Sequence, residues 1–157
     1  MKEAIDIMRI LHHHELYASS RIIRLLMAER GIVCLPKSER PWDRVEEFLR
    51  LNPAGDVPVL MTEDGEAICG ASVIAEYLEE TEEKAPLIWG SASERAEIRR
   101  LTDWFEGKFM REVGAPLLNE RFIKRFVDKR QPSSAVIRVA ITNLHIHLDY
   151  LDWLTEQ

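Results

Sequence analysis

The chain has 157 residues, of which 46% are hydrophobic and 31% charged. This balance is typical of a soluble globular protein and excludes intrinsic disorder, a collagen-like repeat and a disulfide scaffold. The 21 basic and 27 acidic residues give a net charge of −6, which argues against nucleic acid or an anionic membrane as the main partner. The sequence shows neither a membrane-spanning apolar run nor a signal peptide, so we expect a cytoplasmic protein.

The first half of the chain alternates strand-like and helix-like segments. Residues 7–13 form an apolar, β-compatible run, and the segment after it repeats apolar side chains at helical spacing, with Ser19 or Ser20 as its N-cap. A second strand is predicted over residues 32–35, followed by a loop over residues 36–41. This order predicts a βαβ unit at the start of the fold.

A short helix is predicted next. Asp43 and Glu46 have the spacing of a capping box, and the Asn52–Pro53 pair ends the helical pattern because the residue before a proline avoids helical geometry.

A β-hairpin and a further helix follow. Residues 57–61 predict a strand, but Pro58 inside it cannot donate to a sheet, so it is expected at the strand start or edge, where a cis bond before it would turn the chain sharply. Asp64–Gly65 predicts a tight turn into a return strand over residues 67–69, and residues 72–82 predict a helix. The whole order predicts a small sheet, parallel in its first half and antiparallel in its second, with helices on its faces.

The second half of the chain predicts helix almost throughout. Residues 1–83 and 91–157 are predicted to be separate domains, joined by a linker over residues 84–90. Ser91 and Glu94 form a capping box at the start of the helical domain.

Gly114 and Pro116 are expected to interrupt the first long helix of this domain, and a last helix is expected to start at Ser133. In that last helix His145 and His147 lie two residues apart, so one is expected to face the core and the other solvent.

The cysteines and histidines do not predict a metal centre. Cys34 and Cys69 lie far apart without CxxC spacing, and we expect both to be buried thiols. His12, His13 and His14 suggest a metal site, but zinc needs three or four convergent ligands and no partner motif accompanies them. We therefore expect no bound metal.

Two motifs resemble the glutathione S-transferase superfamily: NPAGDVPVL at residues 52–60 and GASVIAEYLEE at residues 70–80. The resemblance extends to the opening segment MRILHHHELYASSRIIRLLMAERG and to ERAEIRRLTDWF in the second half. It implies an α/β thioredoxin-like N-terminal domain of order βαβαββα, followed by an all-α C-terminal domain. Family members have a longer helical domain, so this one is expected to be incomplete and to cover its apolar faces by forming a homodimer.

The resemblance also implies a glutathione site. Val57 would present its backbone N–H and C=O to the cysteinyl part of glutathione, with Pro58 in cis, and Ser72 would bind the γ-glutamyl carboxylate at a helix N-terminus. The family has Glu, Asp or Gln where this chain has Ala71. A missing charge-assisted hydrogen bond costs roughly 1.5–3 kcal/mol, so glutathione is expected to bind weakly or not at all.

The family keeps glutathione as a thiolate by means of a hydroxyl or thiol near the start of the first helix. Tyr17, Ser19 and Ser20 are the candidates in this chain. The alternative is that the two serines only cap the helix.

A narrower resemblance is to alphaproteobacterial FtsZ-localized homologues of this superfamily, which act in cell division without ordinary transferase behaviour. It rests on HHHELYASSR, on PWDR at residues 41–44 and on segments of the helical half. It implies binding to FtsZ filaments. If the chain binds them, we expect the partner surface to include Trp42, Arg44, Glu120 and Arg121. A large aromatic residue in a polar loop, as Trp42 is, serves either as an exposed partner contact or as the anchor of a satellite core. An active glutathione transferase is the alternative function.

Overall fold

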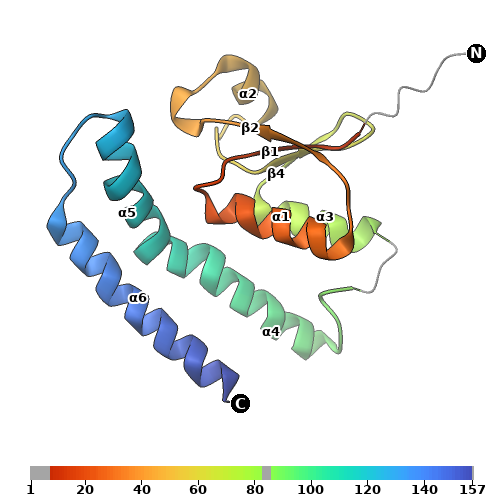
Figure 1. Cartoon of the computed structure of the whole chain (residues 1–157). Coiled ribbons are helices and arrows are strands. Elements are labelled where there is room, and N and C mark those ends of the chain that lie inside the picture. Colours follow the sequence, from red (N-terminus) through yellow and green to blue (C-terminus); the bar gives the residue numbers. More distant parts are fainter. Residues whose placement is uncertain (1–7, 83–85, 157) are drawn as a thin grey trace, which may run out of the picture. The chain divides into compact units, whose positions relative to one another are not determined.

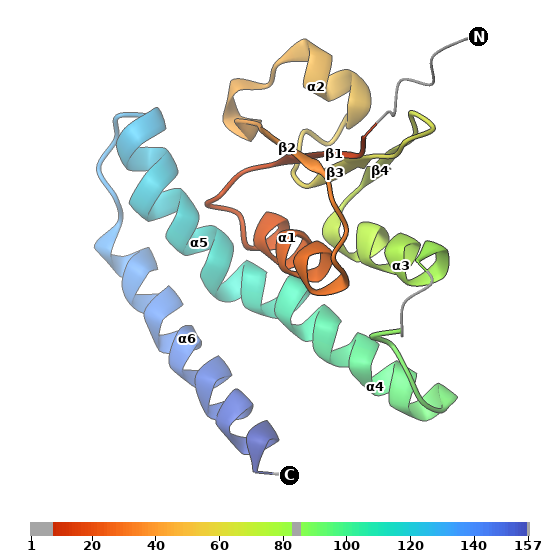
Figure 2. The ribbon, with the colours of Figure 1, turned by 45° about the vertical axis from the view of Figure 1, so that its right-hand side comes forward.

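The computed structural model describes residues 8–82 and 86–156, and Figures 1 and 2 show it from two sides. The chain divides into two compact units, Met1–Leu87 and Ile88–Gln157. The predicted linker overlaps residues 83–85, which lie outside the described residues, and its exact limits stay a prediction.

The N-terminal unit is built on a four-stranded sheet (Figure 1). The strands are β1 (Ile10–His13), β2 (Leu35–Ser38), β3 (Val59–Met61) and β4 (Ala67–Cys69), in the order β2-β1-β3-β4. β1 pairs in parallel with β2, whereas β1 with β3 and β3 with β4 pair antiparallel. The predicted half-parallel, half-antiparallel sheet of a thioredoxin-like domain is confirmed.

Helices cover both faces of this sheet (Figure 1). α1 (Ala18–Arg30) and α3 (Ala71–Thr81) lie together on one face, where they bury the main core. That core includes Leu11, Ile23, Leu60, Ile74 and Leu78, all 0% exposed. The 3₁₀ turn η1 (Pro41–Asp43) and α2 (Glu46–Leu51) precede β3, and Phe48 of α2 packs with Val57 and Val59 in a second, smaller cluster.

The second strand begins three residues later than predicted. Ile32 and Cys34 pack against the main core, and the strand starts only at Leu35, whose N–H donates to the Arg9 carbonyl at 2.8 Å. Pro36 therefore lies inside β2, which the sheet tolerates because β2 is an edge strand and needs ladder hydrogen bonds on one side only.

Two of the predicted helix caps are wrong. The N-cap of α1 is Tyr17, and neither α1 nor α2 has a side-chain cap among the described residues. The Asp43–Glu46 capping box does not form, because Asp43 belongs to the preceding 3₁₀ turn and Val45 is the N-cap of α2.

The C-terminal unit consists of helices, as predicted. Its elements are α4 (Ala92–Asp103), the π-helical segment η2 (Trp104–Gly114), α5 (Ala115–Leu118), a second π-helical segment η3 (Asn119–Val127), and α6 (Ser134–Thr155). The Ser91–Glu94 capping box is confirmed, and Ser133 caps α6 by accepting a hydrogen bond from the Val136 N–H at 3.4 Å.

The expected interruption at Gly114 and Pro116 is not observed, because the helical path runs on from η2 through α5 to η3. Proline has no N–H to offer the carbonyl one turn earlier. Here the Glu112 carbonyl accepts a hydrogen bond from the Asn143 side chain of α6 at 3.4 Å. This tertiary contact holds the turn before Pro116 against α6.

A buried histidine joins η2 to α6. His147 is 1% exposed, whereas His145 is exposed, which confirms the prediction for this pair. The Trp104 indole N–H donates to His147 Nδ1 at 3.0 Å, so the ring proton sits on Nε2, which lies 3.2 Å from a Glu112 carboxylate oxygen. Both ring nitrogens are therefore satisfied within the helical unit.

Candidate functional site

The site is built around the Val57–Pro58 peptide bond, which is cis as predicted. Asn52 braces the loop before it: the side-chain amide donates to the Asp56 carbonyl at 2.8 Å, and the amide oxygen accepts from the Ala54 N–H at 3.2 Å. Gly55 has φ +75°, and a Cβ there would lie 3.1 Å from a Leu49 methyl carbon. The spacing of the motif over residues 52–58 thus follows from the requirements of one tight loop.

Ser19 contacts the backbone at the centre of this site. Its hydroxyl donates to the Val57 carbonyl at 3.0 Å. That proton is therefore used inside the protein rather than offered to a thiolate. The Val57 carbonyl keeps a second lone pair, but Val57 as a residue is only 4% exposed.

Ser20 and Tyr17 lie beside Ser19 at the start of α1. Ser20 is 0% exposed, and its hydroxyl accepts a hydrogen bond from the His14 N–H at 3.3 Å. Tyr17 is half-buried and packs against the Phe48 cluster, and its burial, followed by the charge of Asp56, raises the pKa of its phenol. Of the three candidate hydroxyls, that of Ser20 is therefore shielded from any ligand.

The start of α3 provides the other expected part of the site. Gly70 is the N-cap with φ 94°, Ala71 is the first helical residue, and the Ser72 that follows is exposed. The first turn of α3, which is described in full, holds no acidic residue. Ala71 is 8% exposed and belongs to the main core. The helix start can attract a carboxylate through its backbone N–H groups, but it lacks the side-chain acid.

An aromatic cluster lies where β1 leads into α1. It consists of His14, Tyr17 and Trp42; the sequence suggested His14 only as a metal ligand and did not predict its packing against Trp42. The rings of His14 and Trp42 meet edge to face with centroids 4.9 Å apart, and those of His14 and Tyr17 with centroids 5.9 Å apart. Trp42 is half-buried, and Arg44 beside it is exposed with φ 46°.

Glu120 is not available as a partner contact, contrary to the prediction. It is 2% exposed, and its carboxylate pairs with Lys124 at 2.5 Å and accepts from the Ser133 N–H at 2.7 Å. These two donors hold the pKa of Glu120 below its ordinary value. Glu120 thus fastens the end of η3 to the start of α6, while its neighbour Arg121 is exposed.

Among residues 8–82 and 86–156, no three His, Cys, Asp or Glu side chains are grouped so as to hold a metal ion. His12 instead contacts Glu39, with Nδ1 and Oε1 2.7 Å apart. Cys34 and Cys69 are half-buried rather than fully buried, and burial raises the pKa of both thiols. None of the described helices has the length and apolar character needed to cross a membrane.

Comparison with known proteins finds a family model and relatives that agree with each other. Residues 18–81 match the family model for the glutathione S-transferase N-terminal domain. The chain is 37% identical over 155 residues to FtsZ-localized protein A of Caulobacter vibrioides. The matched segment covers 97% of this chain and 68% of that protein.

Two solved structures have the same fold as this chain. A glutathione S-transferase from Rhodospirillum rubrum F11 is 43% identical, with a TM-score of 0.91, over 96% of this chain and 68% of that one. FzlA from C. crescentus is 37% identical, also with a TM-score of 0.91, over 96% of this chain and 68% of that one. The chain thus spans about two thirds of the length of each relative.

Proposed function

The chain belongs to the glutathione S-transferase superfamily, and on that premise we propose that it is a cell-division factor that binds FtsZ filaments and holds glutathione weakly or not at all. The observation that carries the proposal is the 37% identity to FtsZ-localized protein A along 97% of the chain. The similarity therefore includes the helical unit as well as the domain with the glutathione motifs. We also propose a cytoplasmic location and a homodimer.

The geometry of the site supports a role other than efficient thiol chemistry. A free thiol with a pKa of about 8.5 needs a hydrogen-bond donor to be ionised at neutral pH. In this chain the Ser19 proton is directed to Val57, Ser20 is buried, and Ala71 replaces the acid that would hold the γ-glutamyl group. Each of these features lowers either the expected affinity for glutathione or the expected ionisation of its thiol.

The test of the function is co-sedimentation with FtsZ. We expect the full chain to pellet with assembled FtsZ filaments and to stay in the supernatant with unassembled FtsZ. Absence from the filament pellet would contradict the division role. Efficient conjugation of glutathione to chlorodinitrobenzene by the same preparation would favour the transferase alternative, which the 43% identity to the R. rubrum protein makes worth measuring.

Glutathione itself is expected to bind with a dissociation constant weaker than about 1 mM, and Ala71→Glu is expected to tighten binding by about tenfold. The reason is that one charge-assisted hydrogen bond contributes about 1.5 kcal/mol or more. Isothermal titration calorimetry measures both affinities.

The control for this pair is Ala71→Met, which adds a side chain of similar length with neither a charge nor a strong hydrogen-bonding group. A melting temperature for each variant verifies folding, because Ala71 is 8% exposed and a longer side chain must turn outward from the core. Micromolar binding by the unaltered chain would show that the missing acid is dispensable.

A further inference from the structure

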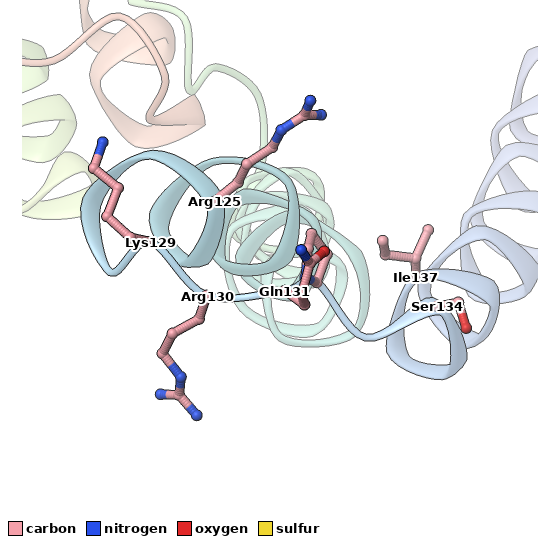
Figure 3. A pocket seen from close by; sticks show the side chains of 7 residues that line it. Arg125, Lys129, Arg130, Gln131, Ser134 and Ile137 are labelled. Atoms are coloured by element: carbon pink, nitrogen blue, oxygen red, sulfur yellow. The ribbon is translucent and has the colours of Figure 1, made fainter.

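A hollow lined by basic side chains lies at the turn between η3 and α6 (Figure 3). We name it the basic hollow and define it by its lining residues: Arg125, Lys129, Arg130, Gln131, Pro132, Ser134 and Ile137. Its volume is about 720 Å³, which is within the range of about 300–1,000 Å³ typical of ligand sites.

The positive charges of the basic hollow are not balanced by ion pairs. Within the described parts of the chain, no carboxylate lies within 4.0 Å of the charged groups of Arg125, Lys129 or Arg130. Lys129 donates to the Phe126 carbonyl at 2.7 Å, and the Arg125 guanidinium lies 5.3 Å from the Phe126 ring centre. The charge of Arg130 also helps to lower the pKa of the buried Glu120 carboxylate, whereas Arg125 and Lys129 form no ion pair within 4.0 Å among the described residues.

The cations border the basic hollow instead of meeting at one point. Arg125 and Lys129 extend to one side of the turn, whereas Arg130 extends to the other (Figure 3). A single phosphate would need donors that converge on it, so this spread favours a ligand that carries several separate negative charges. Pro132 and Ile137 add an apolar part to the lining.

We propose that the basic hollow docks an extended acidic segment of a partner protein. Its carboxylates pair with Arg125, Lys129 and Arg130, and an aliphatic side chain of the segment rests against Ile137. Charge complementarity determines the choice of occupant, and the concave form favours an inserted chain over a flat lipid surface. The basic hollow shares no residue with the cluster of His14, Tyr17 and Trp42, and the proposal does not depend on FtsZ.

The test uses the full chain and a fluorescently labelled 12-residue peptide of Asp and Glu with a central Leu, followed by fluorescence anisotropy. We expect saturable binding that weakens at least about fivefold between low and physiological salt, because exposed ion pairs are screened. Charge reversal in Arg125→Glu/Arg130→Glu is expected to weaken binding at least about tenfold, and Ile137→Ala about threefold.

The matched control is Arg111→Glu/Arg138→Glu. It changes the net charge by the same amount at two exposed arginines of the same unit that do not line the basic hollow. Its affinity should stay within about twofold of the unaltered chain, and circular dichroism verifies that all variants are folded.

Three results would overturn the proposal. The first is absence of peptide binding, and the second is an equal loss in the two charge-reversal variants. The third is evidence that the cations serve another ligand. Selective binding to vesicles containing 30% phosphatidylglycerol would assign the cations to a lipid surface. Displacement of the peptide by inorganic phosphate, beyond that caused by sodium chloride at equal ionic strength, would assign them to a free anion.

Discussion

Replacing Glu79 by alanine is expected to lower the free energy of unfolding of the N-terminal unit by about 3–5 kcal/mol. Glu79 on α3 forms an ion pair with Arg30 at the end of α1, and the two side chains are 9% and 3% exposed. Arg30 also donates to the Leu78 carbonyl at 3.3 Å, and the Leu87 N–H donates to the Glu79 carboxylate at 3.1 Å. Without Glu79 the guanidinium remains buried and loses its ion pair with that carboxylate. Urea unfolding followed by circular dichroism measures the change.

Glu80→Ala is the control for this effect, because it makes the same chemical change at an exposed neighbour on the same helix. It is expected to change stability by less than about 0.5 kcal/mol. The double replacement Arg30→Met/Glu79→Leu should recover most of the loss, since a buried ion pair is often no more stabilising than apolar side chains of similar volume. A loss below about 1 kcal/mol in Glu79→Ala would show that water reaches the pair and screens it.

The parts of the fold that the sequence predicted well depend on local signals. The hairpin turn at Asp64–Gly65, the capping box at Ser91 and Glu94, and the cap at Ser133 each lie within a few residues of chain. Gly65 has φ +84°, which its lack of a side chain allows without strain. The cis bond before Pro58 followed from a resemblance in which the surrounding residues match as well.

The errors occurred where distant residues decide the structure. The apolar run from Ile32 looks like a strand by itself, but the pairing of Ile10 with Leu35 places the start of β2 three residues further on. Likewise, Pro116 is a helix breaker in local terms, yet the helical path continues past it, and Asn143, 27 positions later in the chain, donates to the Glu112 carbonyl in the preceding turn. Neither partner is visible in the local pattern.

The candidate site was predicted in its composition but not in its connections. Tyr17, Ser19 and Ser20 do lie at the start of α1, but the sequence does not reveal that the Ser19 hydroxyl is directed to the Val57 carbonyl. Glu120 was taken for a surface charge because acidic residues are mostly exposed, and its burial depends on the chain folding back so that Ser133 can donate to it. The hydrogen-bond partner of such a polar side chain becomes known only when the fold has brought the helices and strands together.

Trp42→Ala is expected to weaken co-sedimentation with FtsZ filaments by roughly thirtyfold, because a desolvated tryptophan at an interface typically contributes 2 kcal/mol or more. Trp42 is half-buried beside the exposed Arg44, and its ring packs edge to face on His14 with centroids 4.9 Å apart. This support holds the indole in one position before the partner arrives, which reduces the entropy lost on binding. The affinity follows from a titration of pelleted protein against filament concentration.

Two further variants separate binding from folding. Trp89→Ala removes a tryptophan that is 64% exposed outside the cluster of His14, Tyr17 and Trp42, and it should leave pelleting unchanged. His14→Ala loosens the packing of Trp42 but keeps the indole, so it should reduce binding less than Trp42→Ala for a similar loss of stability. If Trp42→Ala melts several degrees lower and its folded fraction still pellets with filaments, Trp42 is a packing residue, and the FtsZ contact must be sought on other exposed groups such as Arg121.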